Sequence, residues 1–414
     1  MMSETRAIEF KHAVLPNGLT VIAEINPEAK SAALGYFVKT GSRDERPEES
    51  GVSHFLEHMV FKGTERRSAW EVNRAFDEMG AQYNAFTNEE HTVFYGAVLP
   101  EFAPQLLELF TDLMRPSLRP EDFETEKKVI LEEIALYQDR PNFVLFERAQ
   151  AHYYQGHPVG NSVLGSVDSI SALTREMMAA YHARRYVPSN MVLAMTGRID
   201  WDRALEQVAA LTEGWAPGEA PRAHPPFTPR SGEAREPYDK AHRAYVALLA
   251  EGVPAADERR YAASVLASIL GDDGNSRLYW ALVDRGLAEA ASAFHEEADG
   301  LGTFYVYLQT DPQRLDEVIA ILQEELERLE REGVRAEEVT QAARKAATGL
   351  AFASETPLNR LFHLGLGFSY TGRYEPLSET SRKVARITAQ EVNALLEARP
   401  FQRGFTFYLL PEEG

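Results

Sequence analysis

The sequence repeats one order of elements in its two halves, and this repeat limits the possible folds more than any other feature. Each half contains an apolar strand, a helix, a hairpin strand, an amphipathic helix and a long helix with acidic residues in its first turn. In the first half these begin near residues 32, 51, 92, 104 and 118. In the second half they begin near residues 244, 262, 303, 314 and 334. The offset stays near 213 residues, so we expect the second half to be a structural duplicate of the first.

A proline-rich segment separates the two halves. Residues 214–237 contain six prolines: Pro217, Pro221, Pro225, Pro226, Pro229 and Pro237. Proline lacks a backbone N–H and breaks regular structure, so the segment predicts a stiff, extended linker. The expected organisation is an N-terminal domain at 1–215, a linker at 216–237 and a C-terminal domain at 238–414. A length of 414 residues suits two domains, each of the α+β class.

Composition excludes several classes of protein. The formal net charge is −20, which disfavours nucleic acid and anionic membranes as partners. The absence of cysteine excludes disulfides, thiolate nucleophiles and thiolate metal ligands, so a transition metal would need His and carboxylate ligands. The N-terminus has no apolar signal segment, and no run of 18 apolar residues occurs. We therefore expect a cytoplasmic protein.

The segment His54-Phe55-Leu56-Glu57-His58 contains the residue types of a metal site. On a helix, His54 and His58 at i and i+4 project from one face, and Glu57 shares that face. We expect Ser50 as the N-cap of this helix and Gly63 just beyond its end. Such a histidine pair also occurs on surface and core helices, so the pattern alone leaves both interpretations open. A zinc site would need one further ligand and an open position for water.

A second helix, beginning at Pro120, offers the missing ligand. Glu126 and Glu133 lie seven residues apart on one face of this helix, so Glu133 could bind the metal while Glu126 hydrogen-bonds a ligand histidine. Glu132 points about 100° away from Glu133 and is the reserve choice for the ligand.

These segments resemble the pitrilysin (insulinase) family of inverzincin zinc peptidases, and most of all the catalytic beta-type subunit of bacterial members similar to the mitochondrial processing peptidase. The resemblance rests on Arg43-Asp44-Glu45, on Gly51 to Met59, on Phe61-Lys62-Gly63-Thr64, on Gly80 to Thr87 and on Glu126 to Ile134. It extends through both halves of the chain.

The resemblance implies a fold, a reaction and a set of site residues. The fold would be two homologous α/β-sandwich domains, each an antiparallel-rich sheet with helices packed on one face, together forming half of a clamshell chamber. The N-terminal domain would bind Zn²⁺ through His54, His58 and Glu133, and Glu57 would act as general base in peptide hydrolysis.

Peptide substrate would add to an edge strand at 82–87 through Asn84, Ala85 and Thr87. Alternatively, this segment is part of an ordinary hairpin that has no role in substrate binding. The second half would hold no metal, because Ala267 and Gly271 stand near the positions of the two histidines.

One departure from the family pattern concerns the second half. Members that act alone carry an Arg and a Tyr there, but this chain has Val283 and Glu289. A related subunit could supply that pair in a heterodimer. Alternatively, the chain could form a homodimer of low activity that uses Arg277 or Arg285 in a shifted position. A rival interpretation is a non-catalytic structural subunit of the same fold.

Overall fold

The computed structural model describes residues 8–412. Its strands are β1 (Glu9–Val14), β2 (Thr20–Ile25), β3 (Ala32–Val38), β4 (Gln82–Thr87), β5 (Thr92–Val98), β6 (Met191–Gly197), β7 (Gly232–Tyr238), β8 (Ala244–Glu251), β9 (Ala290–Ala298), β10 (Leu301–Thr310) and β11 (Phe405–Pro411). Its α-helices are α1 (Val52–Val60), α2 (Ala69–Glu78), α3 (Ala103–Leu113), α4 (Pro120–Gln138), α5 (Pro141–Tyr154), α6 (Val167–Ala172), α7 (Arg175–Arg185), α8 (Trp201–Leu211), α9 (Arg260–Gly271), α10 (Leu315–Glu332), α11 (Ala336–Ala353), α12 (Pro357–Thr371), α13 (Leu377–Ala385) and α14 (Ala389–Leu396). Within residues 8–412, no helix has the length and apolar character needed to cross a membrane.

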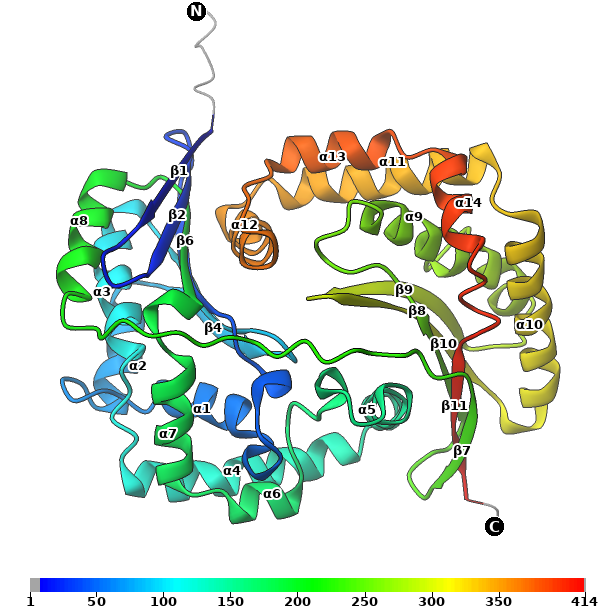
Figure 1. Cartoon of the computed structure of the whole chain (residues 1–414), viewed down its shortest axis with the longest axis horizontal. Coiled ribbons are helices and arrows are strands. Elements are labelled where there is room, and N and C mark those ends of the chain that lie inside the picture. The colour runs from blue at the N-terminus through cyan, green and yellow to red at the C-terminus, as the bar shows by residue number, and fades with distance from the viewer. Residues whose placement is uncertain (1–7, 413–414) are drawn as a thin grey trace, which may run out of the picture. The chain divides into compact units, whose positions relative to one another are not determined.

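The chain forms two compact units, each built around one sheet. Unit 1 comprises residues 8–134, Asn161–Ala223 and Ala353–Leu377. Unit 2 comprises Ala135–Gly160, His224–Phe352 and 378–412. Each unit therefore includes a helix from the other half of the sequence: α12 belongs to unit 1 and α5 to unit 2 (Figure 1). The domain boundaries expected at 215 and 238 do not account for this exchange of helices between the two units.

The sheet of unit 1 has the order β1-β2-β6-β3-β5-β4. Only the β2–β6 pair is parallel, and the other neighbours are antiparallel. Every residue of the central strand β3 is buried, because helices cover both faces of the sheet. On one face, the Tyr36 hydroxyl lies 2.8 Å from the Thr111 hydroxyl of α3. On the other, Ala33 and Phe37 pack against Leu361 and Leu364 of α12.

The sheet of unit 2 has the order β7-β11-β8-β10-β9, with a single parallel pair, β7–β11. One face buries Val246 and Val306 against apolar residues of α9 and α10. The other face buries Leu249 and Tyr305 against Leu145 of α5. Both units are thus mainly antiparallel sheets, and the predicted α+β class is confirmed. Helices on one face only were expected, but α12 and α5 cover the second face of the two sheets.

The predicted repeat is visible element by element. The matching elements are β3 with β8, β5 with β10, α3 with α10, and α4 with α11. The proline-rich segment has no helix or strand from 217 to 231, but β7 begins at Gly232. The last residues of the expected linker therefore belong to the sheet of unit 2.

Candidate metal centre

Helix α1 presents the two histidines on the face that its apolar residues leave free. Phe55, Leu56 and Met59 are fully buried in unit 1, so the helix is anchored by its other faces. Hydrophobic burial on one side of a helix determines which residues face away from the core. His54 and His58 consequently lie side by side, with ring centroids 4.7 Å apart.

The N-terminus of α1 is capped differently from our expectation. The N-cap is Gly51, at φ 88°, and it makes no side-chain cap bond, so the assignment to Ser50 was wrong. Glu45 satisfies the free backbone groups instead: its carboxylate accepts from Gly51 N at 2.7 Å and Ser53 N at 2.8 Å. A carboxylate at this position also matches the positive end of the helix dipole.

Helix α4 brings Glu133 to the histidine pair. The Glu133 Oε2 atom lies 3.8 Å from His54 Nε2 and 3.6 Å from His58 Nε2. One potential ligand atom from each of the three residues falls within 4.8 Å of the other two. Glu132, the reserve choice, is exposed and is not part of this group.

The two separations that involve Glu133 are close to those expected around a tetrahedral zinc ion. The separations of 3.6 and 3.8 Å are too long for hydrogen bonds. Bonds of about 2.0–2.1 Å to zinc at tetrahedral angles would place ligand atoms about 3.3–3.4 Å apart. Two nitrogens and one carboxylate oxygen form a ligand set that suits zinc, and a fourth position would be left for water.

Electrostatics also favour metal binding at this site. Burial, and to a lesser degree His58, lowers the pKa of His54 to about 3, so its imidazole is neutral and can bind a metal. Burial alone would lower the pKa of His58, but its hydrogen bond with Glu126 and the nearby carboxylates of Glu133 and Glu57 raise it. A divalent cation would relieve the repulsion among these carboxylates.

Glu126 is hydrogen-bonded to the His58 ring, as the sequence predicts. Its Oε1 lies 3.0 Å from His58 Nδ1. With Nδ1 held by a carboxylate, Nε2 is directed toward Glu133, the arrangement common around zinc. The second oxygen of Glu126 pairs with Lys62 Nζ at 2.5 Å. Lys62 was not singled out in the sequence, although it falls in the segment Phe61 to Thr64 that carries the resemblance.

Glu57 lies beside this group, and its carboxylate accepts a hydrogen bond from Thr87 Oγ1 at 2.6 Å. Burial raises the pKa of Glu57, and the bond from Thr87 lowers it in part. The electrostatic influence of Glu133 and His58 on Glu57 reflects their proximity.

Strand β4 is the free edge of the unit 1 sheet, beyond β5. Both Asn84 and Ala85 lie on it, and the Ala85 N–H donates to Asn84 Oδ1 at 2.9 Å. An edge strand of this kind can pair with an added peptide. Gly80, at φ 59°, ends the preceding helix α2, which Ser68 and Glu71 open with the expected capping box.

The corresponding helix of unit 2 has no room for a metal site. Ala267 is buried in α9, and a Cβ at Gly271 would lie 2.3 Å from Ala293 N of β9. Glu289, at the expected Tyr position, pairs with Arg243 and accepts from Gln309 Nε2 at 2.8 Å. Arg277 donates to Glu338 at 2.9 and 3.0 Å and is therefore held within unit 2.

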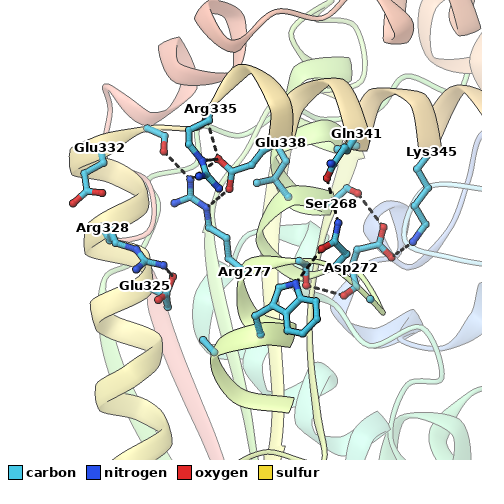
Figure 2. Close-up of a pocket in the computed structure, with 18 of the residues that line it drawn as sticks. Ser268, Asp272, Arg277, Glu325, Arg328, Glu332, Arg335, Glu338, Gln341 and Lys345 are labelled. Atoms are coloured by element: carbon cyan, nitrogen blue, oxygen red, sulfur yellow. Dashed lines mark hydrogen bonds and ion pairs between the residues drawn. The ribbon is translucent and has the colours of Figure 1, made fainter. Parts of the chain in front are cut away.

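A cavity of unit 2 with a volume of about 910 Å³ is lined by Arg277 and Arg285, the alternative substrate-holding residues, but by none of the predicted metal ligands. Figure 2 shows that its charged side chains pair with one another, for example Arg277 with Glu338 and Lys345 with Asp272. The chemistry expected from the sequence therefore lies in unit 1, outside this cavity.

Comparison with known proteins agrees with the geometry. The family model described as "Insulinase (Peptidase family M16)" matches residues 20–167, and "Peptidase M16 inactive domain" matches 172–346. An uncharacterized zinc protease of Mycobacterium tuberculosis is 34% identical over 94% of this chain and 90% of its own length. The uncharacterized zinc protease YmxG of Bacillus subtilis is 30% identical over 93% of this chain and 94% of its own length.

Solved structures show the same fold. A protease from Helicobacter pylori superposes with a TM-score of 0.89 at 21% identity, covering 98% of this chain and all of the other. A chain of Complex III2 from Candida albicans reaches a TM-score of 0.83 at 19% identity, covering 96% and 95% of the two chains.

The histidine–glutamate cluster of unit 1, together with the matching family model and relatives, identifies the class as metallopeptidase. The chain belongs to the pitrilysin/insulinase (M16) family, whose metal is zinc.

Proposed function

We propose that the chain is a zinc endopeptidase that hydrolyses peptide bonds of unfolded peptides, with Glu57 as general base. The observation that carries this proposal is the convergence of His54, His58 and Glu133 from α1 and α4, with Glu57 beside them. The sequence His54-x-x-Glu57-His58 has the inverzincin order.

The side chains have separate tasks in this mechanism. Zinc, when bound, polarises the scissile carbonyl and lowers the pKa of a bound water. His54, His58 and Glu133 hold the metal, and Glu126 orients His58. Glu57 accepts the proton of the attacking water and delivers it to the leaving amine.

Strand β4 is the proposed substrate edge, through Asn84 and Ala85. Main-chain pairing with an edge strand is indifferent to side chains, so it suits unfolded peptides of varied sequence. The Asn84 amide oxygen that now accepts from Ala85 N–H would give way to a substrate carbonyl.

The proposed assembly is a cytoplasmic dimer with a related subunit that supplies an Arg/Tyr pair. Val283 and Glu289 stand at those positions here, and Arg277 is held by Glu338. A homodimer using Arg285 is the alternative. Addition of a related subunit that has the pair but no zinc motif should raise peptidase activity in the heterodimer, whereas the low activity of a homodimer should not rise on that addition.

Replacing Glu57 by Gln tests the function. Glu57→Gln keeps the size of the side chain but removes the base, so kcat should fall by about 100- to 10,000-fold while the zinc-to-protein ratio is unchanged. Metal analysis and cleavage of an unfolded fluorogenic peptide give the two readouts. A protein that holds no zinc, or a variant as fast as the parent, contradicts the proposal.

A non-catalytic structural subunit is the second candidate, favoured by Glu289 at the Tyr position. Glu289 already pairs with Arg243 and accepts a hydrogen bond from Gln309. Its carboxylate is therefore unsuited to holding a substrate backbone. Absence of peptidase activity in the complete, zinc-loaded complex would favour this function.

A further inference from the structure

Thr87 makes one contact that a substrate-binding role does not explain. Its hydroxyl donates to Glu57 Oε2 at 2.6 Å. This length lies in the range of a hydrogen bond from a hydroxyl to an ionised carboxylate, about 2.5–2.7 Å. We propose that Thr87 is the positioning residue of the general base, and this inference rests on the proposed function.

The position of Thr87 in the fold makes its hydroxyl a stable reference for Glu57. It is the last residue of β4 and pairs with Thr92 of β5. Thr92 is itself held by a 2.9 Å bond from its hydroxyl to the Thr40 carbonyl. A β-branched side chain has few χ1 rotamers, so the backbone of the strand determines where the Thr87 oxygen lies.

The hydrogen bond from Thr87 gives the two oxygens of the Glu57 carboxylate different roles. Oε2 is engaged by Thr87, so Oε1 is the oxygen left to accept the proton of the water. Glu57 has several rotatable bonds, and among residues 8–412 its carboxylate accepts a hydrogen bond from Thr87. Without the Thr87 hydroxyl, the carboxylate would spend part of its time turned away from the water, and a misplacement of about 1 Å can lower a rate by about 100-fold.

The same contact connects the base with the substrate edge. Asn84, Ala85 and Thr87 belong to one strand, so a peptide that pairs with β4 lies at a defined distance from Glu57. Thr87 thus acts on kcat through Glu57, and substrate affinity depends on the other residues of the edge.

A pair of variants separates the hydroxyl from the shape of the side chain. Thr87→Val is isosteric and removes only the hydrogen bond, so we expect kcat to fall about 10- to 100-fold with KM and zinc content unchanged. Thr87→Ser should restore most of kcat. Thr340→Val is the control, because it removes a threonine hydroxyl that donates to the Ala336 carbonyl on the exposed side of α11, and its kcat should stay near that of the parent.

A double-mutant cycle distinguishes positioning from a merely structural bond. In the Glu57→Gln background, Thr87→Val should cause no further loss of kcat, since its effect passes through the base. Additive losses would overturn the inference, as would a rise in KM at unchanged kcat, which would make Thr87 a substrate residue. If Glu57→Gln is inactive but Thr87→Val is fully active, only the role of Thr87 fails. If Glu57→Gln is as active as the parent, the proposed function fails with it.

Discussion

At the scale of single residues, the metal centre depends on helical spacing within α1 and on one long-range contact to α4. His54 and His58 share a face because they are four residues apart, which the sequence alone specifies. Glu133 reaches them only because α4 packs beside α1, through contacts such as the stacked rings of Phe55 and Phe123, whose centroids are 4.8 Å apart.

Glu133 and Glu132 are a natural pair of test and control. Glu133→Gln should weaken zinc binding by more than about 100-fold, because it removes an anionic ligand. Loss of a residue that only hydrogen-bonds a ligand lowers metal affinity by at most about 100-fold. Glu132→Gln makes the same chemical change on the exposed side of α4 and should leave affinity unchanged. Zinc affinity measured by chelator competition compares the two. Equal affinities in both variants would remove Glu133 from the ligand set.

The sequence predicts the ligands better than their supports. The predicted group His54, His58 and Glu133 is brought together, and Glu126 contacts His58 as expected. The contacts of Glu57 with Thr87 and of Lys62 with Glu126 could not be predicted. They join residues 30 and 64 positions apart, and no local periodicity encodes which side chains meet across such separations.

At the scale of elements, strands and helices could be predicted, but which sheet each helix covers could not. The apolar stretch 32–38 is strand β3 and the edge segment 82–87 is strand β4. Helix α12 has an apolar face, but nothing in that face specifies the sheet of unit 1 as its neighbour. What determines the neighbour of α12 is the close packing of the Phe37 ring against Gly365, which has no side chain.

That match can be tested with two glycines of the same helix. A Cβ at Gly365 would lie 2.2 Å from Phe37 Cζ, and Phe37 is fully buried in the central strand. Gly365→Ala should therefore destabilise the protein by about 1–3 kcal/mol. Gly367 has nothing within 4 Å of such an atom, so Gly367→Ala should stabilise by about 0.5–1 kcal/mol through helix propensity. Urea unfolding measures both, and equal shifts would show that α12 does not pack closely on β3.

At the scale of the whole molecule, the proline-rich segment is more than the spacer that its composition predicts. Arg222 donates to both oxygens of Asp44 at 3.0 and 2.8 Å within unit 1. Phe227 packs against Tyr153 and Tyr154 within unit 2. Proline spacing predicts stiffness, whereas these attachments depend on pockets formed by distant parts of the chain. The segment therefore contributes to the stability of each unit.

Three buried neutral histidines should each lower the stability of the protein in mild acid. Burial lowers the pKa of His91 to about 3, and those of His182 and His295 to about 4. Unfolding returns each pKa to about 6.5, so between that pH and about 4 the unfolded chain binds protons that the native chain does not. These three histidines therefore lower the free energy of unfolding as pH falls through this window, each by up to about 1.4 kcal/mol per pH unit. Glu45, whose pKa burial raises to about 8, contributes in the opposite direction.

His295 allows this linkage to be isolated. Its Nε2 accepts from the Val253 N–H at 2.9 Å, so protonation would break that bond. His295→Gln keeps an acceptor but cannot titrate, and its unfolding free energy should therefore fall less steeply than that of the parent between pH 6.5 and 4. His242→Gln, at an exposed histidine, is the control and should follow the parent curve. Urea midpoints at several pH values give the slopes. A parent and a His295→Gln variant with parallel curves would mean that this imidazole takes up its proton equally well in the folded and unfolded chain.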